Sequence, residues 1–315
     1  MAEQDGNPQG LAAPRSREQP ASAGPAVAEY SNPQILDGIN VTRTHPLADF
    51  ARLLGGIVVV VGIVIVALAL LAGHLAKYVP FESERDIAER FADRLDGDTP
   101  RPVADYLNAL TQRLAAAHGL PPGMTITVHY LPDATVNAFA TLGGHVAIYD
   151  GLLQKMPNEN ALAMVISHEI AHVKLRHPIT SMGRGIVVGV ALAGISAAAG
   201  GDIVGQVLGP AGLLTMMSFS RDQERAADVA ALEALVKVYG HAGGAADTFR
   251  TLRDAYTGKP RPPEFFSTHP LDADRIAVIE STVTEQGWAA TGELATYPEE
   301  VRAALAASQK NTASE

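Results

Sequence analysis

Cysteine is absent from the 315-residue sequence. Its absence excludes disulfide scaffolds, thiolate zinc sites, iron–sulfur clusters and cysteine nucleophiles. Basic residues are the minority, with 24 Lys and Arg against 34 Asp and Glu and a formal charge of −10. A chain of this charge has no general attraction to polyphosphate, so we expect no nucleic-acid partner. With 47% hydrophobic residues and only 18% charged ones, the chain is too apolar to be disordered throughout.

One long uncharged run lies near the N-terminus. Residues 53–73 read LLGGIVVVVGIVIVALALLAG and, as a helix, would span about 31 Å, which matches the hydrocarbon thickness of a bilayer. A core helix seldom needs apolar residues on every face. We therefore expect a transmembrane anchor over residues 50–78 rather than a buried helix, and a disordered tail over residues 1–49, which are rich in Gly, Pro and Ala.

The remaining sequence predicts one domain over residues 79–308 and a flexible tail over 309–315. Its patterns indicate an amphipathic helix in FESERDIAERFADRL (81–95) and a helix over 103–117 with Val103, Leu107, Leu110 and Leu114 on one face. A strand is expected over 124–130, then a hairpin or paired strands over 137–153 broken by Gly143–Gly144, and helices from Asn158 onward. Helices, a small sheet and then more helices predict an α+β fold that is mainly helical.

The segment 185–219 is apolar and rich in small residues, and Gly200–Gly201–Asp202 and Pro210 interrupt it. Each half is shorter than the roughly 20 residues of a typical membrane span. Two interpretations remain, a transmembrane hairpin or helices packed within the soluble body. Gly and Ala favour close helix packing over lipid-facing bulk, so we expect the second.

A metal-binding motif lies in the helical run NENALAMVISHEIAHVKLRH. His168 and His172 are four residues apart, so on a helix both imidazoles face the same side and can bind one metal ion. Glu169 lies one residue further round the helix, where it can take a proton from the attacking water. Since chance placement of HExxH in such a chain is on the order of 2%, the motif needs a third ligand to be convincing.

The third ligand is expected on a separate helix. His177 lies five residues past His172 and about 140° round the helix, so it is a poor ligand and we expect a structural role. The segment SFSRDQERAADVAALEAL offers Glu224 as the ligand. Asp228, on the same face, can accept the outer N–H of a metal-bound histidine. Outside such a context, this acid pair is typical of a solvated helix face.

The chain resembles the HtpX-type and CAAX-prenyl-protease-type family of membrane zinc metalloendopeptidases, which are gluzincins. The resemblance covers about residues 79–285 and is carried by VPFESE after the anchor, NAFATLGGHVAIYDGLL, HEIAHVKLRH, SRDQERAAD and STHPLDADRI. It implies a gluzincin domain with a small β-sheet next to the HExxH helix. It also implies one Zn²⁺ per chain, bound by His168, His172 and Glu224, with Glu169 as the catalytic base.

Two further groups complete the expected site. His269 and Arg275, in STHPLDADRI, are the candidates for stabilising the tetrahedral oxyanion, as the resemblance also implies. Protein or peptide substrates are expected to bind in extended form along the strand near Asn137, Ala138, Gly143 and Gly144, because a strand edge can add a peptide through main-chain bonds. A plain turn at the two glycines is the alternative.

The anchor and the resemblance together imply quality control of misfolded envelope or membrane proteins. Basic residues on the two sides of the anchor nearly balance, so the positive-inside rule gives no orientation. Single-anchor relatives imply a single pass through the inner membrane at residues 53–73, with the catalytic domain in the periplasm. The alternative function is a metal-containing, chaperone-like or substrate-binding module with little proteolysis, although a pure scaffold would not need Glu169.

Overall fold

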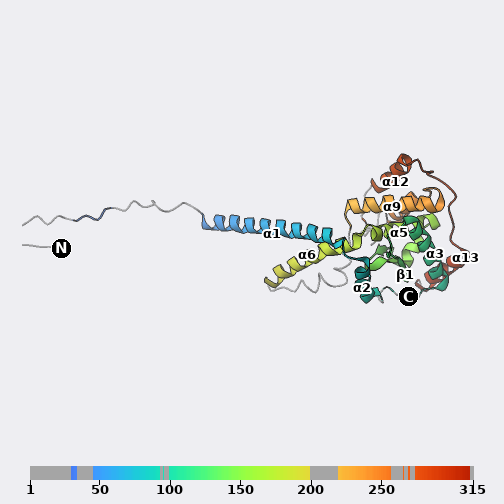
Figure 1. Ribbon diagram of the computed structural model, residues 1–315, viewed down its shortest axis with the longest axis horizontal. Coiled ribbons are helices and arrows are strands. Elements are labelled where there is room, and N and C mark those ends of the chain that lie inside the picture. Colours follow the sequence, from blue (N-terminus) through green and yellow to red (C-terminus); the bar gives the residue numbers. More distant parts are fainter. Residues whose placement is uncertain are drawn as a thin grey trace, which may run out of the picture. The chain divides into compact units, whose positions relative to one another are not determined.

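The computed structural model describes residues 30–33, 45–92, 95, 99–198, 219–256, 265, 269 and 274–312. Most of the tail expected over residues 1–49 lies outside the described residues. The chain divides into two units, Met1–Leu54 and Gly55–Glu315. The first contains the start of helix α1, where Arg52 Nη1 lies 2.9 Å from Asp49 Oδ1. The second contains the core and the site described below (Figure 1).

Helix α1 (Pro46–Ala76) is the candidate anchor. Among the described residues it is the one helix long and apolar enough to cross a membrane, and only 6% of its most apolar window is buried. A core helix of this composition would be covered by other parts of the protein. The long apolar helix predicted from sequence is therefore present as a candidate membrane span, and it begins four residues before the expected boundary at residue 50.

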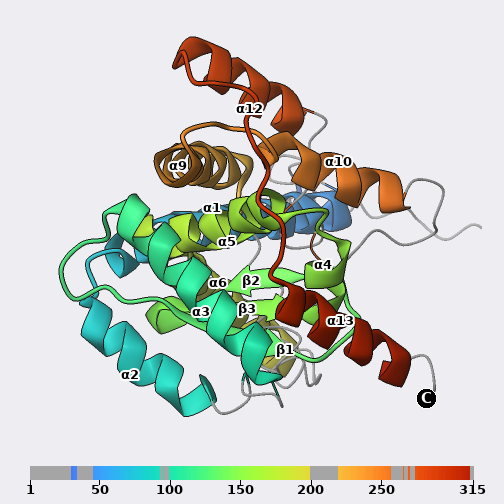
Figure 2. The ribbon, with the colours of Figure 1, turned by 90° about the vertical axis from the view of Figure 1, so that its right-hand side faces the viewer.

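Helix α5 (Glu159–Lys174) forms the centre of the second unit. It starts where Asn158 Oδ1 accepts a hydrogen bond from the backbone N–H of Ala161 at 2.9 Å, which is a standard N-cap. Every residue from Glu159 to Val173 is buried, as expected for a helix that other elements cover on all sides. Figure 2 shows α5 between helix α9 (Arg221–Tyr239) and the small sheet.

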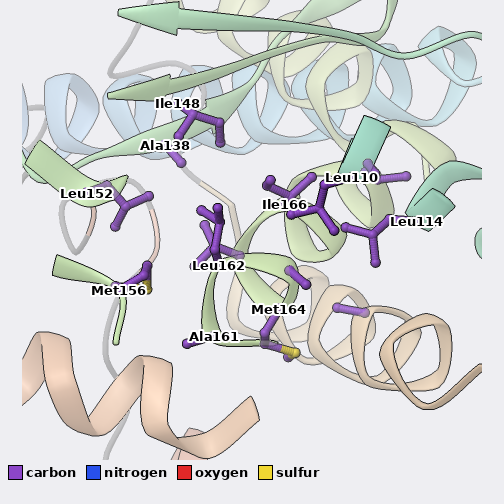
Figure 3. Packing of buried hydrophobic residues seen from close by; sticks show 14 of the residues in the cluster. Leu110, Leu114, Ala138, Ile148, Leu152, Met156, Ala161, Leu162, Met164 and Ile166 are labelled. Atoms are coloured by element: carbon purple, nitrogen blue, oxygen red, sulfur yellow. The ribbon is translucent and has the colours of Figure 1, made fainter. Parts of the chain in front are cut away.

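Helix α3 (Arg101–His118) packs against α5 through the face that its sequence predicted. Its face residues, Val103, Leu107, Leu110 and Leu114, are at most 1% exposed. Figure 3 shows Leu110 and Leu114 facing Ile166 of α5, in the same cluster as Ile148 of the sheet. Each such buried leucine contributes about 1.5–3 kcal/mol relative to an exposed one, so this cluster holds the metal-motif helix firmly in place.

The sheet has three strands in the order β1-β3-β2. Strand β3 (His145–Tyr149) lies in the middle, parallel to β1 (Thr127–Leu131) and antiparallel to β2 (Ala138–Ala140). A 3-10 turn, η1 (Leu142–Gly144), joins β2 to β3, with positive φ at Gly143 and Gly144. The hairpin expected at these glycines is confirmed.

Two boundaries of the sheet differ from the prediction. β1 begins at Thr127 rather than at residue 124, because the preceding residues have no strand partner in the described structure. The extended segment ends at Tyr149 rather than at residue 153, since helix α4 (Asp150–Lys155) begins there. Alternating hydrophobicity does not separate a short buried helix from a buried strand, which explains the second error.

A buried ion pair ties the region after the anchor to the end of α5. Arg176 lies in the turn between α5 and helix α6 (His177–Ala198), where it adopts a left-handed φ of 63°. Its Nη1 lies 2.8 Å from Glu84 Oε2 of helix α2 (Phe81–Ala92), and its Nη2 donates to the carbonyl of Val79. Glu84 Oε1 also accepts the backbone N–H of Gly143. Burial raises the pKa of Glu84, and these two partners oppose that rise.

The expectation that 185–219 packs within the soluble body is wrong for the described part of α6. The side chains of Ile186, Val190 and Leu192 are 46%, 66% and 40% exposed. Small residues in a helix are compatible with close packing but do not by themselves provide a partner surface. Residues 199–218, the rest of this segment, lie outside the described structure.

The C-terminal part is helical, as predicted. It contains α10 (Ala245–Tyr256), α12 (Asp274–Glu285) and α13 (Glu299–Thr312). α13 runs to Thr312, so the domain boundary expected at residue 308 falls inside a helix. The fold class predicted from sequence, α+β and mainly helical with a small sheet, is confirmed.

Candidate metal centre

Helix α5 positions the two histidines of the HExxH motif on its inner face. His168 Nε2 and His172 Nε2 are 3.0 Å apart, and their side chains are 1% and 0% exposed. The spacing of four residues brings the two rings together one above the other, as the sequence predicted. Two imidazole nitrogens thus face one point in the interior.

Helix α9 brings a carboxylate to the same point. Its start is fixed by a capping box in which Ser220 Oγ accepts the N–H of Gln223 and Gln223 Oε1 accepts the N–H of Ser220. Glu224, in the first turn, places Oε2 3.3 Å from His168 Nε2 and Oε1 3.4 Å from His172 Nε2. Two distant parts of the sequence therefore meet at one cluster of ligand atoms.

His269 is a fourth member of this cluster. Its Nδ1 lies 3.1 Å from Glu224 Oε1 and 3.3 Å from His168 Nε2. Its backbone N–H donates to the carbonyl of Phe265, and the two rings stack with centroids 4.8 Å apart. Sequence reasoning expected His269 near the reacting atoms as a donor. The structure brings it closer still, among the possible ligands.

Glu169 lies beside the cluster and is fully buried. Neither of its carboxylate oxygens has a hydrogen-bond partner within the described residues. His269 Nε2 lies 3.4 Å from Glu169 Oε1. A buried carboxylate without a donor is costly to keep, so its presence here indicates that it serves a ligand or a reaction rather than stability.

Asp228 lies where a histidine-orienting carboxylate would have to be. Its Oδ1 lies 2.9 Å from His168 Nδ1, the ring nitrogen that faces away from the cluster. Arg275 donates to Asp228 through Nε at 2.9 Å and through Nη2 at 2.6 Å. Its Nη1 lies 3.1 Å from Glu224 Oε2. All three guanidinium nitrogens thus lie close to these carboxylates, and the role of Arg275 in stabilising the oxyanion stays a prediction.

Aromatic rings that sequence reasoning missed support the centre. Phe219 stacks on His172 with centroids 3.9 Å apart and an angle of 19° between the rings. Arg275 Cζ lies over the Phe249 ring, 4.5 Å from the ring centroid. Phe219 directly precedes the capping serine of α9, but nothing in its spacing indicated a ring contact with the metal motif. His177, expected to be structural, has its Nδ1 2.8 Å from His172 Nδ1 and lies outside the donor cluster.

The expected substrate strand is β2, which lies at an edge of the sheet. Asn137 and Ala138 are both buried, and Asn137 Oδ1 has no hydrogen-bond partner within the described residues. A side chain on Gly144 would come within 2.0 Å of the Thr125 carbonyl, and one on Gly143 within 2.9 Å of the Ala88 side chain. The small size of these glycines therefore serves the packing of the chain itself.

The chemistry of the cluster fits a divalent cation. Ligand atoms of His168, His172, Glu224 and His269 all lie within 4.8 Å of one another. Burial alone would lower the pKa of His168, but Asp228 and Glu224 raise it to about 9. The two carboxylates therefore favour positive charge at this point of the interior. Imidazole nitrogen and carboxylate oxygen, without thiolates, form a ligand set typical of catalytic zinc.

Comparison with known proteins identifies the family. Residues 103–283 match peptidase family M48, which covers more than half of the chain and both metal-binding helices. The chain belongs to peptidase family M48. The match starts in α3 and ends in α12, so it includes the sheet and the whole donor cluster.

Several M48 relatives show how far the similarity extends. The beta-barrel assembly-enhancing protease of Escherichia coli is 30% identical over 216 residues, or 62% of this chain and 42% of that protein. Mitochondrial metalloendopeptidase OMA1 of Schizosaccharomyces pombe is 30% identical over 208 residues, which cover 65% of this chain and 60% of that protein. Metalloprotease LoiP of E. coli is 30% identical over 189 residues, which cover 58% of this chain and 73% of that protein. The chain thus spans less than half of the length of the beta-barrel assembly-enhancing protease.

Three of the sequence-based predictions are confirmed by these findings. The family predicted from the motifs is that of membrane-associated zinc metallopeptidases of the M48 type. The domain is a zinc metallopeptidase domain, and zinc is the cofactor that both the family and the donor cluster indicate. Membership of this family implies peptide or protein substrates.

Proposed function

We propose that this M48 chain is a membrane-anchored zinc metalloendopeptidase in which His168, His172 and Glu224 bind the metal and Glu169 is the general base. One observation carries the proposal. It is the buried cluster of ligand atoms beside a carboxylate whose oxygens have no hydrogen-bond partner within the described residues. A purely structural metal site would not need that second carboxylate.

Each neighbouring side chain has a distinct task in this mechanism. Zn²⁺, when bound, supplies a Lewis acid that polarises the scissile carbonyl and makes water more acidic. Glu169 takes the proton of the attacking water and later gives it to the leaving amine. Asp228 accepts the Nδ1–H of His168 and so keeps the Nε2 lone pair free for the metal. His269 donates to the developing oxyanion, and Arg275 neutralises and orients the two acidic side chains it contacts.

Substrate is proposed to bind as an extended chain along β2. This strand lies at the sheet edge and contacts α5, which carries the HExxH motif. An extended peptide added there would be held mainly by main-chain hydrogen bonds, with little sequence preference. Asn137 Oδ1, which has no hydrogen-bond partner in the described part of the chain, would accept a further bond from that peptide.

The cellular role we propose is proteolytic quality control of misfolded envelope or membrane proteins. α1 would cross the inner membrane once, through residues 53–73, and hold the catalytic domain on the periplasmic side. The support is α1, the one helix among the described residues that is long and apolar enough to cross a membrane, together with the relatives named beta-barrel assembly-enhancing protease and mitochondrial metalloendopeptidase. A C-terminal reporter fusion that is active only in the cytoplasm would contradict this orientation.

Replacing the third ligand tests the metal site. Glu224→Ala should weaken zinc binding by about 100-fold or more, since even residues behind the ligands contribute 10–100-fold. The matched control is Asp222→Ala, two residues earlier on α9, whose side chain is 94% exposed. Metal analysis after dialysis should give one zinc per chain for the wild type and for Asp222→Ala. Full zinc content in Glu224→Ala would refute the proposed ligand set.

Replacing His269 separates two tasks for that ring. If it donates to the oxyanion, His269→Ala should lower kcat for a peptide substrate by about 100-fold with KM little changed. His129→Gln, on β1 and outside the donor cluster, is the control and should leave kcat unchanged. A rise in kcat for His269→Ala would instead mean that the imidazole competes with water for the metal, and would rule out the donor role.

A further inference from the structure

The outer part of α6 exposes an apolar surface to which the described structure gives no cover. Among the described residues after Tyr78, seven large hydrophobic side chains are exposed, and four of them lie on α6, namely Ile186, Val188, Val190 and Leu192. Val190 is the most exposed of the seven at 66%. At this spacing Ile186 and Val190 lie on one side of the helix and Val188 and Leu192 on the other. A soluble protein rarely exposes large apolar side chains on opposite sides of one helix unless they contact a partner or a membrane.

α6 makes very close contact with the end of the anchoring helix. A side chain on Gly73 of α1 would come within 2.7 Å of the Arg184 side chain, and one on Gly183 within 3.1 Å of the Ala72 carbonyl. Figure 1 draws these parts of α1 and α6 next to each other. Small residues that let two backbones approach so closely are typical of helix pairs in membranes. The surface of α6 is thus continuous with that of the proposed anchor.

On both helices the charged residues end near the contact between Gly73 and Arg184. On α1 no charged residue occurs between Gly55 and Gly73, and on α6 none occurs from Gly185 to Ala198. Arg184 lies at the contact itself, with its aliphatic stem against Gly73 and its guanidinium donating to Ser181 Oγ and Gln223 Oε1. Arg side chains at the ends of membrane helices place their stems in apolar surroundings and their charged groups at the interface.

We propose that α6 enters the bilayer beside α1, so that lipid covers the surface formed by Ile186, Val188, Val190 and Leu192. From Gly185 to Ala198 the helix extends for about 21 Å, against a hydrocarbon thickness of about 30 Å. Residues at the covered face of α1 recur at helical spacing, with Ala69 and Gly73 buried and Gly62 half-buried. This pattern favours a neighbouring helix that continues along α1 beyond the contact at Gly73.

The consequence concerns the substrates of the metal centre, and this step rests on the proposed function. His177, the first residue of α6, contacts the proposed ligand His172, and Arg184 lies only seven residues further on, about 10 Å along the helix axis. Gln223, which accepts from Arg184, directly precedes Glu224. The metal centre would therefore lie close to the headgroups, where it meets the chain segments of membrane proteins that emerge from the bilayer.

Single-cysteine labelling tests the lipid contact directly, because the chain has no cysteine of its own. Val190→Cys on α6 is compared with Val229→Cys on α9, another exposed valine, and with Ile63→Cys on α1. Each full-length variant carries an environment-sensitive fluorophore and is reconstituted into vesicles of phosphatidylcholine and phosphatidylglycerol. We expect the probe at residue 190 to be quenched by spin-labelled lipid as at residue 63, and to lose the quenching by aqueous iodide that the probe at residue 229 shows.

Two outcomes would overturn the proposal. Iodide quenching at residue 190 equal to that at residue 229 would place this surface in water. Protection from both quenchers would mean that a second copy of the chain or another protein covers it instead of lipid. Zinc content and peptide hydrolysis, measured on the same preparations, keep failure of the proposed enzyme separate from failure of the lipid contact.

Discussion

Glu169→Gln is expected to lower kcat for peptide hydrolysis by about 10²–10⁴-fold, which is the usual contribution of a general base. The amide has nearly the same shape as the carboxylate but cannot accept the proton of the attacking water. Because Glu169 is not among the four clustered donors, zinc content should stay at the wild-type level. Loss of rate with retention of metal is therefore the expected combination, measured by initial rates and metal analysis on one preparation.

The control is the same Glu-to-Gln substitution at an exposed glutamate outside the site. Glu233→Gln changes a side chain on α9 that is 52% exposed and paired with Lys237, so it should retain the wild-type rate. If Glu169→Gln hydrolysed an unfolded protein substrate at the wild-type rate, the proposed mechanism would be wrong. If it lost zinc as well, Glu169 would have to be counted among the residues that hold the metal.

Arg275→Ala is expected to destabilise the fold by about 3–5 kcal/mol, because it leaves a buried ionic cluster without its cation. Burial alone would raise the pKa of Asp228, but His168 and Arg275 lower it, so this carboxylate stays charged in the interior. Without the guanidinium, Asp228 and Glu224 would repel each other. Equilibrium unfolding in urea, with zinc at saturation, measures the change.

Two further variants make the Arg275 experiment conclusive. Arg275→Lys keeps the charge but loses the two parallel hydrogen bonds to Asp228, so it should recover part of the stability and remain measurable if the alanine variant does not fold. Arg253→Ala on α10 removes an exposed arginine paired with Asp254 and should change stability by less than about 0.5 kcal/mol. Equal stability of Arg275→Ala and Arg253→Ala would contradict the ionic role.

The sequence is most informative where a local rule decides the structure. The face of α3 and the hairpin at Gly143–Gly144 follow from periodicity and from glycine punctuation, and both are confirmed. His168 and His172 are brought together by helix geometry alone. Glu224 could be chosen because it follows the motif in a separate helical segment, but only the folded chain brings it within 3.4 Å of both rings.

What the sequence could not provide depends on tertiary packing. Arg275 was predicted to stabilise the oxyanion, and no spacing rule indicates that its guanidinium also contacts Asp228 and Glu224. The stacking of Phe219 on His172 likewise joins residues far apart in sequence. The exposed face of α6 was missed because composition reports how apolar a helix is and not which neighbours cover it.

The turn after α5 restricts which substitutions the sequence can accept at Arg176. A glycine in place of Arg176 would relieve the left-handed backbone, which is unfavourable for a side chain with a Cβ. The same replacement would leave Glu84 buried without its cation. Arg176 and Glu84, 92 positions apart in sequence (176 − 84), are therefore expected to change together among descendants of this gene, and neither should drift alone.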